Sequence, residues 1–300
     1  MSGHEDPGSQ QSGQLYVVAT PIGNLDDLSV RARKVLSQVE RIYAEDTRTS
    51  SVLLAQYGLQ TTLKSFHAHN EAKAAPEIIA YLRAGHSVAL ISDAGTPGVS
   101  DPGALLVTQA HAAGIRVVPI PGANAAITAL CATGFAGAFT FIGFLPNKST
   151  ARRKTLELSR DGAAHLIFYE APHRILECIE DIAAVMGADR ELVIARELSK
   201  MFEQIHRCKA GEALAWLQQD ANRQRGEFVV VVQGANAQEE TAFAEGARVL
   251  RLLLEELPLK QAARLAASLS GARKNQLYEL GLEWAKIRDM EVPVAEENDE

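Results

Sequence analysis

The chain has 300 residues, more than one hydrophobic core usually holds, so we expect two domains of roughly 100 to 150 residues each. Hydrophobic residues make up 47% and charged residues 22% of the sequence, which is typical of a globular protein and argues against a disordered chain. The formal charge is −7, so any binding of nucleic acid must come from local basic clusters and not from the field of the whole molecule.

Cysteine usage and hydropathy together favour a reducing compartment. Cys131, Cys178 and Cys208 are odd in number, widely spaced and without a CxxC pair, which argues against a disulfide framework and a structural zinc site. Residues 1–14 lack the basic start and the apolar run of a signal peptide, and we expect them to form a disordered leader. No run of about 18 apolar residues is present, so we predict a soluble cytoplasmic protein without a membrane span.

Short apolar runs alternate with helical patterns over residues 15–134. The predicted strands are Leu15 to Ala19, Ile42 to Ala44, a third strand before His67, Ser87 to Ile91, and Arg116 to Ile120. A helix candidate follows each of them, which is the βαβ order of a mainly parallel sheet with helices on its faces. This part is the predicted first α/β domain.

A second α/β domain is predicted over residues 135–236, after glycines and prolines that cluster from Gly134 to Pro146. Its predicted strands are His165 to Tyr169, Leu192 to Ala195, Gln204 to Cys208 and Phe228 to Val232. Only one short helical stretch, at 211–219, separates the last two, so we expect part of this sheet to be antiparallel.

Residues 240–286 have a wholly helical pattern, followed by an acidic tail at 287–300. The pair Ser270-Gly271 is predicted to separate the last two helices, and two short helices joined by such a turn resemble helix-turn-helix geometry. Lys260, Arg264, Arg273 and Lys274 give this unit a basic edge. Contact with RNA and a capping bundle with solvated charges are both open interpretations.

Loops at the carboxyl ends of strands are where open α/β sheets bind ligands. In VATPIGNLDDLS, Pro21 and Gly23 predict a tight turn, and Asn24 to Asp27 are expected to cap a helix beginning near Leu28. Neither GxGxxG nor GxxxxGK[ST] is present, which argues against nicotinamide enzymes and P-loop nucleotidases.

The loop ISDAGTPGVSDPG after the fourth strand is richer in glycine than a connecting turn requires. Gly95 allows backbone to approach a ligand, and Asp93 and Thr96 offer polar groups to it. Asp101, followed by Pro102, is expected to cap the next helix, whereas no structural role is evident for Asp93. After the fifth strand, Asn124 is both a helix cap and a possible ligand contact.

Eight motifs in order resemble one family: VATPIGNLDDLS, EDTRTS, SFHAHNE, SDAGTPGVSDPG, PGANAAITAL, GFLP, YEAPHR and RELSKMFE. Over about residues 15–286 the chain is similar to the ribosomal RNA small-subunit methyltransferase I branch of the tetrapyrrole methylase superfamily. The first loop is less glycine-rich than in classical tetrapyrrole methylases, and Asp93-Ala94-Gly95 stands where they have a Gly-Asp-Pro-like turn. Both differences favour the RNA branch.

The resemblance implies the class III methyltransferase fold, in which two α/β domains flank a cofactor cleft, here with a small C-terminal helical unit. It implies transfer of a methyl group from S-adenosyl-L-methionine to the 2′-hydroxyl of a cytidine in the decoding region of 16S rRNA, by a homodimer. The net charge of −7 leads us to expect the 30S subunit rather than free RNA as the substrate. The implied cofactor contacts are Pro21, Ile22, Gly23, Asp93, Gly95, Thr96, Pro97, Asn124, Ala125, Tyr169 and Glu170.

Methyl transfer to a hydroxyl requires alignment of donor and acceptor and a group that accepts the proton. Asp46, His69 and Lys200 are the predicted catalytic residues, from a wider set that includes Glu45, His67 and Glu170. No metal is expected, because the HxH pair at 67–69 has no further ligands nearby. The predicted RNA contacts are Arg48, His67, Lys148, Arg152, Arg153, Lys154 and Arg174, of which the cluster NKSTARRK supplies four.

Two other functions compete with this interpretation. One is C-methylation of a tetrapyrrole by the same fold, against which the basic NKSTARRK segment and the helical appendage argue. The other is a noncatalytic RNA-binding module that binds the cofactor without turnover.

Overall fold

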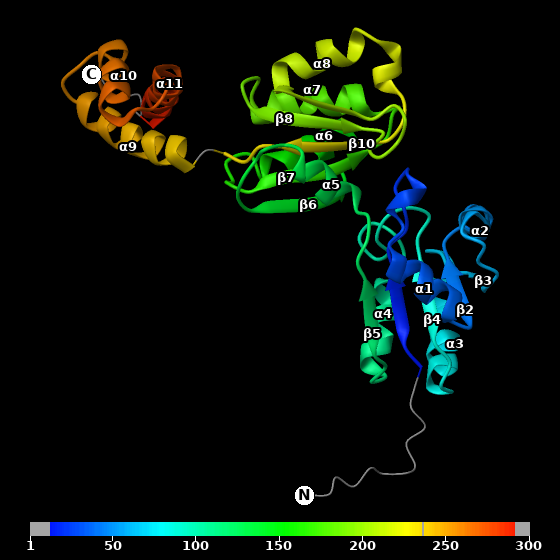
Figure 1. Cartoon of the computed structure of the whole chain (residues 1–300). Helices are drawn as coiled ribbons and strands as arrows, with labels where there is room; N and C mark the ends of the chain where they lie inside the picture. Colours follow the sequence, from blue (N-terminus) through cyan, green and yellow to red (C-terminus); the bar gives the residue numbers. More distant parts are fainter. Residues whose placement is uncertain (1–12, 236, 292–300) are drawn as a thin grey trace, which may run out of the picture.

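The computed structural model describes residues 13–235 and 237–291, which form two sheets and a helical unit (Figure 1). The strands are β1 (Leu15–Val18), β2 (Arg41–Ala44), β3 (Thr62–Ser65), β4 (Val88–Ile91), β5 (Val117–Ile120), β6 (Phe139–Phe144), β7 (His165–Glu170), β8 (Glu191–Arg196), β9 (Gln204–Lys209) and β10 (Phe228–Val232). The helices are α1 (Val30–Gln38), α2 (Thr47–Gln56), α3 (Glu71–Arg83), α4 (Ala104–Ala112), α5 (Ala125–Cys131), α6 (Ser149–Glu157), α7 (Ile175–Met186), α8 (Ala210–Gln218), α9 (Ala237–Leu253), α10 (Leu259–Ser270) and α11 (Lys274–Glu291), with 3-10 turns at Leu25–Asp27 and Ala221–Gln224.

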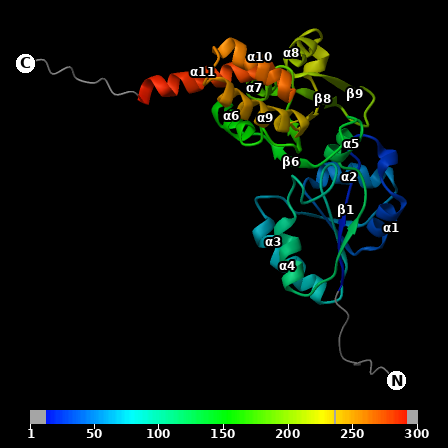
Figure 2. The ribbon, with the colours of Figure 1, turned by 90° about the vertical axis from the view of Figure 1, so that its left-hand side faces the viewer.

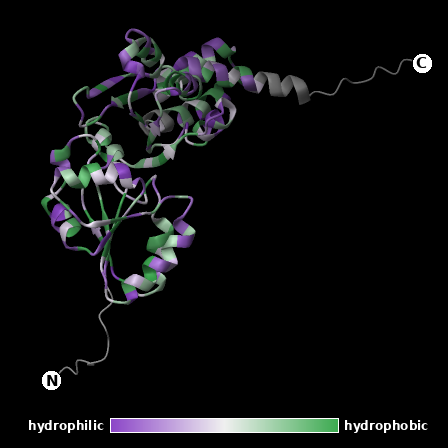
Figure 3. Ribbon diagram, turned by 90° about the vertical axis from the view of Figure 1, so that its right-hand side faces the viewer, coloured by the Kyte–Doolittle hydropathy of each residue, from purple (hydrophilic) through white to green (hydrophobic). Residues whose placement is uncertain are grey.

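The first sheet has the strand order β3-β2-β4-β1-β5, and all of its pairs are parallel. Its central strands β2 and β4 are buried on both faces: α1 and α2 pack over one face, and α3 and α4 pack over the other. A sheet covered on both sides needs apolar residues at every position, which explains the fully buried run VALI in β4. Green and purple alternate along the surrounding helices because each buries only one side (Figure 3). The predicted parallel sheet with helices on its faces is confirmed.

The second sheet has the order β6-β7-β10-β8-β9, in which only β6 and β7 pair in parallel. The expected antiparallel part is therefore confirmed. Alternate residues of the strands face opposite sides: Phe168 packs with α6, α7 and α8, whereas Ile167 packs with α5. Since α5 packs on this sheet, the change from one core to the next falls between β5 and α5, before residue 134.

Two local predictions are wrong, and one strand was not predicted. Asp101 does not cap α4, which begins at Ala104 with Gly103 in the N-cap position. The first long helix begins at Val30 with Ser29 as its cap, because Asn24 caps the short 3-10 turn that precedes it. Strand β6 lies in the segment interpreted as glycine- and proline-rich connection.

The C-terminal unit α9–α11 has its own small core, built around Leu250, Ala262, Ala266 and Leu277. The predicted break is confirmed: α10 ends at Ser270, and Gly271 adopts a left-handed conformation with φ of 79°. Figure 2 shows α9, α10 and α11 gathered beside one another. Among the described residues, no helix combines the length and the apolar character needed to cross a membrane.

Both predicted chain ends fall largely outside the described residues. Of the leader, only Gly13 and Gln14 are described, and Gly13 donates a backbone hydrogen bond to Leu82 at 2.8 Å. Of the acidic tail, residues 287–291 belong to α11, and residues 292–300 lie outside the described part.

Candidate active site

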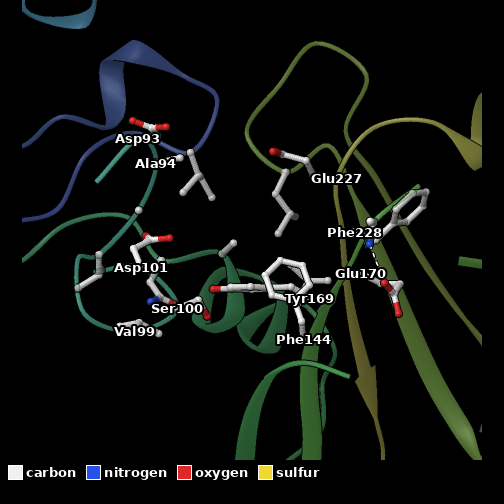
Figure 4. A pocket seen from close by; sticks show the side chains of 18 of the residues that line it. Asp93, Ala94, Val99, Ser100, Asp101, Phe144, Tyr169, Glu170, Glu227 and Phe228 are labelled. Atoms are coloured by element: carbon white, nitrogen blue, oxygen red, sulfur yellow. Dashed lines mark hydrogen bonds between the residues drawn. The ribbon is translucent and has the colours of Figure 1, made fainter. Parts of the chain in front are cut away.

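The two domains enclose a cavity of about 520 Å³ (Figure 4). Loops that follow β1, β2, β4 and β5 line it from the first domain, and the ends of β6, β7 and β8 with the start of β10 line it from the second. It therefore lies where the ligand rule for α/β sheets places a site. The lining residues are Ile22, Glu45, Asp93, Ala94, Gly95, Thr96, Val99, Ser100, Asp101, Asn124, Ala125, Phe144, Tyr169, Glu170, Ala171, Pro172, Leu198, Glu227, Phe228 and Val229.

Hydrogen bonds join the loop after β4 to the loop after β1. Backbone hydrogen bonds join Thr20 and Gly95 in both directions, at 2.8 and 3.0 Å, and the buried Thr20 hydroxyl donates to the carbonyl of Ser92 at 3.1 Å. Gly95 has a φ of 79°, a conformation that residues with side chains rarely adopt. The Thr96 hydroxyl donates to the carbonyl of Ala123 at 3.1 Å, which links this loop to the start of α5.

Three carboxyl groups line the first-domain side of the cavity. Burial raises the pKa of Glu45, and the neighbouring carboxyls of Asp101 and Asp93 raise it further. Burial also raises the pKa of Asp101, against the opposite effect of a hydrogen bond with Ser92. Each of these two groups is therefore harder to ionise than a carboxyl in water, and a bound cation would relieve that cost. The cavity is suited to a ligand with positive charge.

The second-domain side combines aromatic rings with a buried carboxyl. The ring of Tyr169 makes an edge-to-face contact with Phe144, with ring centroids 5.7 Å apart. Glu170 is 2% exposed, accepts a hydrogen bond from the backbone of Ala171 at 2.8 Å, and forms an ion pair with Arg174 at 3.2 Å. Apolar faces beside the carboxyls suit a ligand with both a planar ring system and a charged end.

Eight of the eleven predicted cofactor residues line the cavity: Ile22, Asp93, Gly95, Thr96, Asn124, Ala125, Tyr169 and Glu170. The other three do not line it. Pro21 and Pro97 are buried within their loops. Gly23 packs against Lys200, because a Cβ atom at Gly23 would lie 2.4 Å from Cγ of Lys200.

The lining residues outside the predicted cofactor set are Glu45, which was a catalytic candidate, and Ala94, Val99, Ser100, Asp101, Phe144, Ala171, Pro172, Leu198, Glu227, Phe228 and Val229. Ala94, Val99, Ser100 and Asp101 belong to the loop after β4 that the sequence analysis singled out, whereas those from Phe144 onward come from the second domain and depend on how the domains meet.

None of the predicted catalytic residues lines the cavity, although Asp46 and Lys200 are hydrogen-bonded to the lining residues Asp93 and Glu227. Asp46 caps α2, and its hydrogen bonds with Arg48 lower its pKa to about 2, so it is a weak base. Lys200 donates to Glu197 and Glu227 at 2.9 and 2.8 Å; these bonds outweigh the effect of burial and raise its pKa, so it holds its proton. His69 is exposed and follows the edge strand β3.

The predicted RNA contacts fall into two groups. Arg48, Arg153, Lys148 and Lys154 are exposed, and His67 is half-buried beside His69, with ring centroids 5.9 Å apart. Arg48 and Arg153 are paired with carboxylates, whereas Lys148 and Lys154 form no ion pair within the part of the chain that the structure describes.

For Arg152 and Arg174 the expected exposed position is corrected. The side chain of Arg152 is 0% exposed and bonds to the buried carboxylate of Asp181 at 2.6 Å. Arg174 is 14% exposed and donates to the carbonyl of Leu145 at 2.7 Å, besides its pairing with Glu170. Both guanidinium groups are bonded to carboxylate and carbonyl partners inside the protein. They therefore stabilise the connection between β6 and α6, in which Lys148 lies.

Metal ligation finds no support in residues 13–235 and 237–291, where no three His, Cys, Asp or Glu side chains converge as a metal site. The cavity residues do fit S-adenosylmethionine. The three carboxyls suit its sulfonium and ammonium charges, and Tyr169 and Phe144 offer apolar surface to its adenine.

Comparisons with known proteins agree with this architecture. A family model described as Tetrapyrrole (Corrin/Porphyrin) Methylases matches residues 14–214, and one described as RsmI C-terminal HTH domain matches residues 240–285. Proteins named ribosomal RNA small subunit methyltransferase I are similar over most of the chain. The one from Escherichia coli O157:H7 is 50% identical over 94% of this chain and 99% of its own, and that of Pseudomonas aeruginosa is 52% identical over 91% and 98%.

Solved structures support the fold at lower identity. A uroporphyrin-III C-methyltransferase from Thermus thermophilus has a TM-score of 0.53 at 20% identity and covers 74% of this chain and 94% of its own. A diphthine synthase has a TM-score of 0.59 at 16% identity, over 74% and 90%. Because the family model covers both α/β domains into α8 and the relatives extend through the helical unit, the chain belongs to the tetrapyrrole methylase family, in its ribosomal RNA small subunit methyltransferase I branch.

Proposed function

We propose that this protein transfers a methyl group from S-adenosyl-L-methionine to the RNA of the small ribosomal subunit. The observation that carries the proposal is the cavity between the domains, with three carboxyls on one side and aromatic rings on the other, in a chain about 50% identical to enzymes named for small-subunit rRNA methylation. Tetrapyrrole methylases of solved structure are at most 20% identical among those compared, which favours the RNA substrate over a tetrapyrrole.

The finer proposal is methylation of the 2′-hydroxyl of a cytidine in the decoding region of 16S rRNA, by a cytoplasmic homodimer. The net charge of −7 favours an assembled 30S subunit over naked RNA, because the whole protein repels phosphates and must dock through local surfaces. Equal methylation rates on naked 16S rRNA and on 30S subunits would argue against that preference. Light scattering of the purified protein would test the dimer.

The reaction is an in-line displacement, in which the ribose oxygen bonds to the methyl carbon as the carbon–sulfur bond breaks. When bound, S-adenosylmethionine supplies a methyl group activated by its sulfonium charge. The chain's residues hold donor and acceptor in line and receive the hydroxyl proton. We assign the proton to Asp101, which points into the cavity near Ser100 and Tyr169 (Figure 4). Asp101→Asn should lower kcat more than cofactor affinity; equal losses would contradict the assignment.

Label transfer tests the proposed function. The purified protein is incubated with methyl-labelled S-adenosylmethionine and 30S subunits that lack the modification, and the label is mapped to a nucleotide and to its ribose or base. Label on a ribose 2′-oxygen in the decoding region is expected. Tight cofactor binding without any label in rRNA would refute the RNA substrate.

The pH dependence of cofactor binding follows from the raised pKa values of Glu45 and Asp101. Their ordinary values are 4.5 and 3.8, and the cationic cofactor binds best when both groups are ionised. Affinity should therefore fall as pH decreases through a range above those values, and reach a plateau at higher pH. Calorimetric titration from pH 4 to 8 measures this. The double variant Glu45→Gln, Asp101→Asn should bind more weakly and without this dependence, whereas Glu77→Gln on α3 should retain it.

Lys148 and Lys154 are the cations of the segment NKSTARRK that form no ion pair with the described residues, and they are therefore available to RNA. Replacing both with alanine should weaken binding to 30S subunits. The slope of log affinity against log salt should become shallower by about 0.7 to 0.9 for each phosphate that is no longer neutralised. Lys34→Ala on α1 is the control. An unchanged slope in the double variant would show that this surface does not face phosphates.

A further inference from the structure

The segment Glu197–Glu203 after β8 contains unusual backbone. Glu197 and Ser199 have φ values of 51° and 68°, and they are the non-glycine residues with positive φ in the described chain. Residues with side chains rarely adopt this conformation, and it persists only where the surroundings impose it. The segment is therefore held in one shape rather than free to adapt.

Side chains on both sides of the segment hold it. Lys200 bridges Glu197 and Glu227 at 2.9 and 2.8 Å, and the backbone amide of Ser199 donates to the carboxylate of Glu203 at 2.7 Å. The Ser199 hydroxyl donates to Asp27 in the first domain. These bonds fix the loop across the boundary between the domains.

The fixed loop presents two large apolar side chains to solvent. Met201 is 90% exposed and Phe202 is 69% exposed. Scattered exposed apolar residues are ordinary on protein surfaces. This pair differs because it is adjacent in sequence, lies on a constrained backbone, and follows shortly after Leu198, which lines the cavity. Constraint of the backbone lowers the entropy that a partner must overcome when it binds there.

Sheet register places the start of this loop beside the cavity. Arg196, the last residue of β8, pairs with Phe228 of β10, which in turn pairs with Glu170 of β7, and the latter two line the cavity. Arg196 also donates to the carbonyl of Phe202 at 3.2 Å and to that of Arg225 at 2.5 Å. The side chain of Arg225 forms no ion pair in the ranges that the structure describes. The backbone of Arg225, a cationic residue, therefore lies close to the backbone of Phe202.

We propose that Phe202, supported by Met201, is a stacking platform for an unpaired nucleobase of the RNA substrate, with Arg225 beside it for a phosphate. This inference rests on the proposed function. A nucleotide whose ribose enters the cavity must leave its neighbours, so its base or the adjoining base loses stacking. An aromatic side chain next to the cavity replaces that contact, and a nearby cation suits the backbone. A second copy of this chain is the competing occupant.

Four variants test the platform: Phe202→Ala, Phe202→Leu, Phe202→Trp and the control Leu158→Ala. Leu158 is 83% exposed and lies past the end of α6, in the connection that enters β7 at the end opposite to the cavity-lining Glu170. Phe202→Ala should raise the KM for 30S subunits roughly 5- to 100-fold, the range for the removal of one base stack. Phe202→Leu should lose most of the same affinity, Phe202→Trp should retain it, and cofactor affinity should be unchanged throughout.

A second measurement separates the platform from the proposed function. Binding of a fluorescent single-stranded oligoribonucleotide with the decoding-region sequence is titrated with wild type and variants, which needs no methyl transfer. Weaker binding by Phe202→Ala and Phe202→Leu supports the platform even if rRNA receives no label from the wild type. Wild-type binding by Phe202→Leu, or conversion of a dimer to a monomer by Phe202→Ala in light scattering, would overturn it.

Discussion

Replacing Asp181 with alanine is expected to destabilise the second domain by about 3 to 5 kcal/mol, the cost of leaving a buried charge without its partner. Asp181 accepts a hydrogen bond at 2.6 Å from the guanidinium of Arg152, whose side chain is 0% exposed. The second carboxylate near this guanidinium is that of Glu177, which lies 3.6 Å away on a side chain that is 72% exposed. Water cannot solvate the guanidinium at this position, so loss of Asp181 leaves its charge with only the distant Glu177 carboxylate and the carbonyl of Asn147 as partners. Urea unfolding followed by circular dichroism measures the free energy of unfolding.

Two further variants make the Asp181 result specific. Glu177→Ala should cost at most about 1 kcal/mol, because a largely exposed ion pair contributes little. Arg152→Met in the Asp181→Leu background should recover most of the stability, since apolar residues can replace a buried ion pair. A cost below about 1 kcal/mol for Asp181→Ala would mean that Arg152 is not buried as the structure has it, and would restore it as a candidate RNA contact.

Replacing Ala94 with tryptophan is expected to lower affinity for S-adenosylmethionine roughly 100-fold, which corresponds to about 2.7 kcal/mol. Ala94 lines the cavity and is exposed rather than packed in the core, so the larger side chain occupies ligand space without disturbing the fold. Calorimetric titration measures the affinity, and the midpoint of thermal unfolding should be unchanged.

Ala84→Trp provides the matched control for the cavity variant. Ala84 is exposed at the end of α3, before β4 begins, and thus at the edge of the first sheet away from the cavity. Its cofactor affinity should equal that of the wild type. Undiminished affinity in Ala94→Trp would place the cofactor outside this cavity.

The sequence predicted the first domain and its ligand loops well because both follow from local rules. Apolar runs such as Val88–Ile91 identify buried parallel strands, and ligands bind at the carboxyl ends of such strands, which led to Asp93, Thr96 and Asn124. Strand β6 escaped prediction because Gly143 has a φ of 80° and the register with β7 shifts between Phe141 and Gly143, which breaks the alternation of a regular strand.

The side chains that failed as predictions are those whose role depends on distant partners. Arg152 belongs to a basic run that is typical of an RNA-binding face, and only its contact with Asp181 from α7 shows that it is buried. Asp101 before Pro102 resembles a helix cap, yet the turn continues to Gly103 and leaves its carboxyl in the cavity. In the second-domain wall, the family resemblance supplied Tyr169 and Glu170, whereas Leu198 and Phe228 could not be predicted because their position depends on how two separately folded sheets meet.

The most direct test of the central claim is a crystal structure of the full chain with S-adenosylhomocysteine, the product of the proposed transfer. The ligand is predicted in the cavity between the domains, with its ammonium group near Glu45, Asp93 and Asp101 and its adenine against the second-domain wall around Tyr169. A ligand bound at any other position, with this cavity empty, would contradict the assignment of the active site.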